Sequence, residues 1–209
     1  MPEHRNRVAA SPLLYALVLF TMLAGGCSST KIDVAPPTIE PARAALSPRP
    51  ATAPAGQVLP LTGRPQAALT DAATGSLLVL CPGADPKAAA TLAVVSRTGA
   101  VRPITLPGPA TAAAGDGRGT VYAATRGGFF TIDTGRGTAT RTDIAGHSDT
   151  DFTAIARRAD GRLVLGDAHG VAYTLADDFT VAATADIFAR VDAIVTEGET
   201  AVVLDRGQT

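Results

Sequence analysis

The stretch GTVYAATRGGFFTIDTGRGTAT, from Gly119 to Thr140, contains the most informative strand pattern of the chain. Short runs of β-branched and aromatic residues alternate with glycine-rich joins, and no long segment past residue 30 places apolar residues at helical spacing. The join TGRG tolerates positive φ because glycine lacks a Cβ atom. This stretch therefore predicts antiparallel strands linked by tight turns.

The same pattern recurs along the chain, and this recurrence predicts a repeat architecture. Four similar strands are GSLLVL at Gly75, GTVYAA at Gly119, GRLVLG at Gly161 and ETAVVL at Glu199, separated by 44, 42 and 38 residues. These separations are typical of a β-propeller blade. A segment of small or β-branched residues precedes each strand and is predicted to be the innermost strand of its unit: AALTD from Ala67, TAAAG from Thr111, FTAIA from Phe152 and VDAIV from Val191.

Two further strands are predicted in each complete unit. They are GFFTID and TATRTDI in the second unit, and VAYTL and TVAATA, joined across ADDF, in the third. The predicted fold is all-β, with four-stranded antiparallel blades that bury their faces only against neighbouring blades. The predicted domain at 63–209 divides into blades at about 63–108, 109–148, 149–187 and 188–209, the last incomplete.

A family resemblance follows from these residues. GTVYAATRGGFFTIDTGRGTAT resembles a blade of the YncE-like and related seven-bladed β-propellers, and the resemblance extends over about residues 63–209. TIDTGRGT, from Thr131 to Thr138, also partly resembles the Asp-box of sialidase propellers but lacks its terminal aromatic residue. Because that motif is a structural turn, we assign it no catalytic role.

The number of units leads to a further expectation. Residues 63–209 accommodate about three and a half blades, whereas propellers close with ~4 to 8. The final residues AVVLDRGQT run from a strand into an apparent turn. We therefore expect a truncated chain or gene fragment with an exposed sheet face and unpaired strand edges.

The N-terminus resembles a bacterial lipoprotein signal. A short basic head precedes the apolar run Val8–Leu23, which is too short for a bilayer span of ~20 residues. The run leads into a sequence that resembles a lipobox: Leu23, Ala24, Gly25, Gly26 and Cys27. The resemblance implies a signal helix at 1–26, removal of that segment, and a diacylglycerol group on the Cys27 thiol. The alternative is an uncleaved N-terminal helix with an incidental cysteine.

The segment 27–62 is predicted to be a disordered tether, because it combines seven of the prolines with alanine, serine and threonine. The abundance of alanine, and of arginine over lysine, suggests an actinobacterial type of genome. We thus expect a protein anchored in the cell membrane by lipid, with its folded part on the extracytoplasmic face.

Few residues are candidates for chemistry. His147, Asp149 and Asp151 are weak candidates for a metal site, since oxygen ligands so spaced suit a hard cation such as Ca²⁺, but a solvated turn is the simpler interpretation. His169 with Asp167 also suggests a turn. Cys81 suggests a small buried residue that ends a strand, with a reactive thiol as the alternative.

Composition and motifs narrow the function classes. The 18 basic and 19 acidic residues nearly balance, so we expect no nucleic-acid partner. Because the sequence contains no Ser-His-Asp arrangement, HExxH, CxxC, P-loop or dinucleotide fingerprint, we predict no catalytic residues and no cofactor.

Three hypotheses remain open. The first is a binding module for an envelope protein or a cell-wall ligand. The second is a propeller enzyme, such as a metal-dependent lactonase or a quinone-dependent dehydrogenase, whose site lies largely in missing blades. The third is an unfolded remnant of a disrupted gene.

Overall fold

The computed structural model describes Thr52 and residues 55–56, 58–186 and 188–207. The chain divides into two units, Met1–Ala53 and Pro54–Thr209, and the second contains nearly all of the described residues. The predicted signal segment 1–26, its lipobox with Cys27, and most of the tether 27–62 lie outside them. In the described ranges, no helix is long and apolar enough to cross a membrane.

The described residues form fourteen strands. Their bounds are β1 Ala67–Asp71, β2 Ser76–Cys81, β3 Thr91–Val95, β4 Val101–Thr105, β5 Ala112–Gly115, β6 Thr120–Thr125, β7 Gly128–Asp133, β8 Thr138–Asp143, β9 Phe152–Arg157, β10 Leu163–Asp167, β11 Val171–Leu175, β12 Val181–Asp186, β13 Ala193–Glu197 and β14 Thr200–Leu204.

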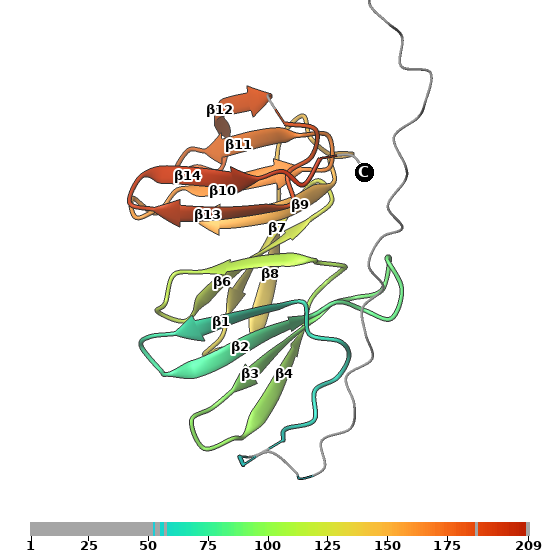
Figure 1. Cartoon of the computed structure of the whole chain (residues 1–209), viewed down its shortest axis with the longest axis vertical. Coiled ribbons are helices and arrows are strands. Elements are labelled where there is room, and N and C mark those ends of the chain that lie inside the picture. The colour runs from blue at the N-terminus through green and yellow to red at the C-terminus, as the bar shows by residue number, and fades with distance from the viewer. Residues whose placement is uncertain (1–51, 53–54, 57, 187, 208–209) are drawn as a thin grey trace, which may run out of the picture. The chain divides into compact units, whose positions relative to one another are not determined.

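The strands form three four-stranded antiparallel sheets and one two-stranded hairpin. The sheets β1–β4, β5–β8 and β9–β12 are here called blades 1, 2 and 3, and the hairpin β13–β14 is called half-blade 4. β1 lies beside β5, β5 beside β9, and β9 beside β13, so the first strands of the sheets converge (Figure 1). The prediction of an all-β fold built from propeller blades is confirmed.

The predicted innermost strands are β1, β5, β9 and β13, although β5 and β13 begin slightly later than their sequence segments. Val191, which opens the segment VDAIV, lies before β13 and is fully buried. Its backbone N–H donates to the carbonyl oxygen of Asp167 in blade 3, at 3.1 Å. This hydrogen bond ties the connection to blade 3, which explains why Val191 is not part of β13.

Adjacent blades share hydrophobic cores. On β7 the consecutive residues Phe129 and Phe130 are both fully buried, and they belong to different cores. Phe130 packs with Leu80 and Leu92 of blade 1, whereas Phe129 packs with Leu165 of blade 3. Since successive residues of a strand point to opposite faces, blade 2 buries both of its faces against its neighbours.

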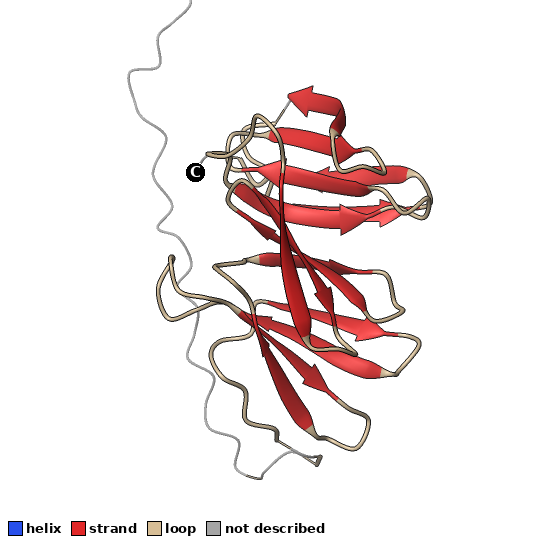
Figure 2. Cartoon of the chain, turned by 180° about the vertical axis from the view of Figure 1, so that it is seen from behind, coloured by secondary structure: helices blue, strands red, loops and turns tan. Residues whose placement is uncertain are grey.

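The face of blade 1 that points away from blade 2 is partly covered by chain that precedes β1. Leu61 packs on Val79, Cys81 and Ala93, and the Cα of Gly63 lies so close that a Cβ there would be 3.5 Å from the Cβ of Cys81. Figure 2 shows the four sheets from behind, with this segment leading into blade 1. A stretch of the predicted tether therefore serves as part of the folded body.

Half-blade 4 has one buried and one exposed face. Ile194 and Val203 pack with Ala154 and Val164 of blade 3. The other face exposes large apolar residues in register: the exposed fraction is 65% for Val195, 57% for Val202 and 52% for Leu204. Such a face is the exposed sheet surface that the repeat count led us to expect.

Gly166→Ala is expected to destabilise the fold. A Cβ at Gly166 in β10 would lie 2.1 Å from a methyl carbon of Val191, so the residues must shift, which costs ~1–3 kcal/mol of unfolding free energy. The measurement is denaturant unfolding of Gly166→Ala, Val191→Ala and the double variant. We expect the double variant to be more stable than the sum of the single effects predicts.

The matched control is Gly115→Ala in β5, where the nearest atom to the new Cβ would be 3.7 Å away, which is an ordinary contact. It should change the unfolding free energy by less than ~0.5 kcal/mol. Strictly additive effects of Gly166→Ala and Val191→Ala would contradict the packing described here.

Candidate functional site

One edge of the sheets gathers the long loops and is the candidate functional surface. In each antiparallel blade, the start of the first strand, the loop between the second and third strands, and the connection to the next blade lie at the same edge. We call this edge the loop face and define it by residues 82–90, 106–111, 126–127, 144–151, 168–170 and 188–192. The β2–β3 loop, residues 82–90, projects farthest from its sheet (Figure 1).

A small axial cavity lies where the first strands converge. It has a volume of about 230 Å³ and is lined by the starts of β1, β5, β9 and β13, with Ala67, Ala112, Ala154 and Ala193 among its residues. The small side chains allow four strands to approach one another, as the sequence of the innermost strands predicted. Thr153 lines the same cavity and donates its hydroxyl to the carbonyl oxygen of Val191 at 2.6 Å.

A larger groove, of about 690 Å³, adjoins the axial cavity through their shared residue Thr111. We call it the Lys87 groove. Its floor is mostly apolar, and its charged residues are exposed: Lys87, Arg126 and Asp151. These residues come from the β2–β3 loop, the end of β6 and the start of blade 3, so the groove exists only when three blades are assembled.

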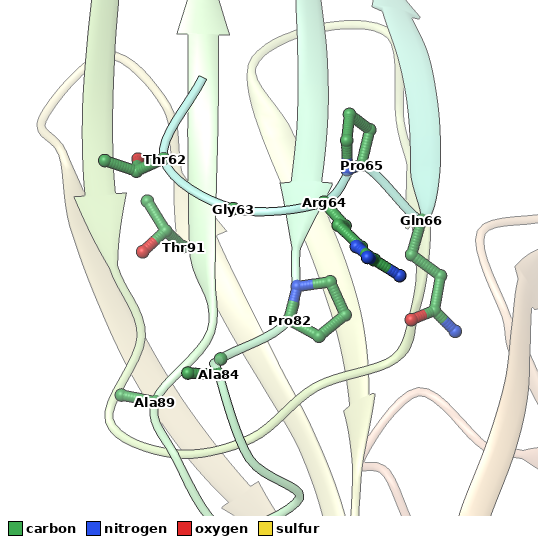
Figure 3. A pocket seen from close by; sticks show the side chains of 10 residues that line it. Thr62, Gly63, Arg64, Pro65, Gln66, Pro82, Ala84, Ala89 and Thr91 are labelled. Atoms are coloured by element: carbon green, nitrogen blue, oxygen red, sulfur yellow. The ribbon is translucent and has the colours of Figure 1, made fainter. Parts of the chain in front are cut away.

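A second cavity, of about 730 Å³, lies on the other side of the β2–β3 loop. Figure 3 shows Arg64, Gln66 and Pro82 around it, with the segment Thr62–Arg64 passing across the strands of blade 1. Gln66 lines both this cavity and the axial cavity. Gln66 and Thr111 thus each border two of the three hollows.

Ion pairs stabilise the part of the loop face that leads into half-blade 4. Asp192 is paired with Arg190 at 3.3 Å and with Arg206 at 3.6 Å, and its carboxylate also accepts the backbone N–H of Arg206 at 3.0 Å. Hydrogen bonds from the backbone N–H groups of Ala189 and Gly207 lower the pKa of the half-buried Asp205. These contacts connect the entry to β13 with the end of β14.

The sequence candidates for a metal site are placed in one loop but do not form a ligand set. Asp149 and Asp151 are exposed, whereas His147 is half-buried and its ring packs on that of Tyr173 with centroids 4.9 Å apart. Nδ1 of His147 lies 3.3 Å from the Thr150 hydroxyl. Among the described residues, no group of three or more His, Cys, Asp or Glu side chains could hold a metal ion.

Asp167 lies in the turn that the sequence predicted, and it also has a role in the core that the sequence did not indicate. Its carboxylate is only 3% exposed and accepts hydrogen bonds from the backbone N–H groups of His169 and Val171 and from the hydroxyl of Tyr173, each at 2.9 Å. Burial, followed by the hydrogen bond to Asp167, raises the pKa of Tyr173 to about 12. The residue thus closes the β10–β11 turn and orders the core beside it.

Repeated aspartates at turns were the available signal for this role. Asp116 accepts the N–H groups of Arg118 and Thr120 in the β5–β6 turn, with the same two- and four-residue spacing as Asp167. Burial opposes ionisation of Asp116, but these hydrogen bonds hold its pKa below the ordinary value. What the spacing could not indicate is that Asp167 is buried and paired with Tyr173.

Cys81 lies at the end of β2, is 1% exposed, and is not paired in a disulfide. Burial raises the pKa of its thiol, which lowers the fraction of thiolate. The structure thus places Cys81 where the first interpretation, a buried residue at a strand end, expects it.

Comparisons with known proteins support the fold. The chain has a β-propeller fold. It is similar to virginiamycin B lyase from Staphylococcus aureus, with 14% identity and a TM-score of 0.54, over 68% of this chain and 48% of that one. It is also similar to the WD40 β-propeller domain of Doa1, with 12% identity and a TM-score of 0.53, over 66% of this chain and 47% of that one.

A third similar structure is the extracellular domain of the putative one-component system BT4673 from B. thetaiotaomicron, with 16% identity and a TM-score of 0.50, over 66% of this chain and 20% of that one. The chain thus spans about half the length of the first two structures and a fifth of the third. No protein-family model and no curated protein matches the sequence.

Asp167→Asn is expected to weaken blade 3 and to lower the pKa of Tyr173. Loss of the charged acceptor should cost ~1.5–3 kcal/mol of unfolding free energy. Because the folded state raises the pKa of Tyr173 to about 12, its neutral phenol contributes stability that is complete below the ordinary pKa of about 10 and disappears as the pH rises through about 12. Tyrosinate absorbance, compared with that of Tyr173→Phe, measures the pKa.

Asp178→Asn is the control, since Asp178 lies in the exposed β11–β12 turn and accepts only from Thr180. Its effect should be below ~1 kcal/mol. Equal destabilisation by both variants would contradict a special role for the buried carboxylate.

Proposed function

We propose that this protein is a lipid-anchored, extracytoplasmic β-propeller of the bacterial cell envelope, and that it acts as a binding module through its loop face. The observation that carries the proposal is the Lys87 groove, which three blades build together beside the axial cavity. A concave surface with an apolar floor and a few polar groups is typical of recognition sites.

The chemistry of the groove suggests how it would bind. Pro86, Pro109 and Ala110 offer a rigid, apolar floor, while the cationic Lys87 and Arg126 stand with one carboxylate, Asp151, around it. Apolar contact would supply affinity and the charges would set orientation. An exposed segment of an envelope protein or a cell-wall ligand would suit this surface.

The proposed location rests on the N-terminal sequence. The lipobox-like residues 23–27 and the proline-rich segment after them would place the propeller on a tether outside the membrane. One similar structure is the extracellular domain of a putative one-component system, which is consistent with a propeller used outside the cytoplasm.

Cys27→Ser is expected to release the protein from membranes. Each buried lipid methylene contributes ~0.8 kcal/mol, so loss of both chains removes stable anchoring. The measurement is membrane fractionation in the native host together with mass spectrometry of the mature N-terminus. Cys81→Ser, which alters only the buried thiol, should remain in the membrane fraction. An unmodified Cys27 in membrane-bound wild-type protein would contradict the anchor.

The binding surface can be tested in cells by placing a photo-crosslinking amino acid at Lys87 or at Arg126. We expect both positions to yield the same discrete adduct, identified by mass spectrometry, because both border one groove. Thr140, exposed on the outermost strand β8, is the control position and should not yield it. Identical adducts at all three positions, or none at Lys87 and Arg126, would contradict the loop face as the binding surface.

A further inference from the structure

The exposed face of half-blade 4 has the features of an inter-blade surface. Val195 and Val202 face each other across the hairpin, and Leu204 pairs with Ala193 on the same side. In the described residues, no strand pairs with the outer edge of β14. A two-stranded hairpin with only one packed face is marginally stable on its own, so a partner that covers the exposed face would stabilise it.

The interfaces already present in the protein indicate how that face would be covered. The first strands follow one another in the order β1, β5, β9 and β13, and each blade presents one face to the blade before it and the other to the blade after it. At the last of these interfaces, Ala154 and Ala156 of β9 lie against Ile194 of β13. The next member of this series would meet the face of β13 that carries Val195.

Blade 1 offers a matching surface on its opposite side. On β1, Ala68 and Thr70 are small and exposed, as is suitable for close approach of a neighbouring first strand. Leu77 of β2, on the same side as Val79, is 41% exposed, although Leu61 covers Val79 itself. The apolar surface that remains uncovered on blade 1 is thus a surface that half-blade 4 of another molecule could contact.

We infer that two copies of this chain associate head to tail, with half-blade 4 of each copy packed on blade 1 of the other. Two such contacts close a ring with two-fold symmetry. The ring would hold six four-stranded blades and two half-blades, which is within the range of ~4 to 8 units in closed propellers. In two copies, the portions that align with virginiamycin B lyase or with the Doa1 domain together amount to about one length of that structure.

The first test is the mass of the purified full chain in detergent, measured by light scattering after size exclusion. We expect a dimer, and we expect Val202→Asp to convert it to a monomer because a carboxylate in the contact would be desolvated. Thr140→Asp, on the exposed β8 away from both surfaces, should leave the dimer unchanged. A monomeric wild-type protein, or higher assemblies that do not close, would overturn the inference.

The second test introduces no charge into the apolar face, so that it does not depend on the folding of Val202→Asp. Two differently tagged chains carry Val195→Cys and Thr70→Cys, both with Cys27→Ser and with the buried Cys81 retained. A short bismaleimide should join the thiol introduced by Val195→Cys in one chain to the thiol introduced by Thr70→Cys in the other, which gives a covalent product that carries both tags. Thr140→Cys paired with Thr70→Cys should give no such link. Linking of Val195→Cys chains to each other would instead indicate hairpin-to-hairpin contact and would overturn the head-to-tail arrangement.

Discussion

The structure depends on the fact that a four-stranded sheet has two apolar faces and can cover neither by itself. Phe129 and Phe130 make this plain, because these consecutive residues of β7 are both fully buried in different cores. Burial of one such side chain contributes ~1.5–3 kcal/mol. Blade 2 is therefore stable only between blades 1 and 3. The outer faces of blade 1 and of half-blade 4 likewise have to be covered.

The outer faces of blade 1 and half-blade 4 are covered to different extents. At blade 1, Leu61 and the residues around Gly63 cover part of the outer face, where Cys81 lies. At half-blade 4, Val195, Val202 and Leu204 stay exposed. This asymmetry favours a head-to-tail contact over one between identical faces, because the two ends of the described fold present different surfaces.

The same packing rule creates the candidate binding surface. Small residues at the starts of the first strands let those strands converge, which leaves the axial cavity, while the longer loops stand around it. The Lys87 groove combines residues of three blades. A propeller thus obtains a recognition surface from loops whose positions are set by the blade cores, in agreement with the general rule that rigid scaffolds carry functional loops.

The strands, their grouping in units of about 40 residues and the turns were predictable from the amino-acid sequence, because β-branched runs, glycine spacing and aspartate turns are local properties. The folded structure was needed to show that Asp167 is buried against Tyr173, that Leu61 covers Cys81, and that Gly166 leaves room for Val191. It also brought Lys87, Arg126 and Asp151 together around one groove. Such features depend on which residues distant in sequence lie beside one another, and that is set by blade packing rather than by any local pattern.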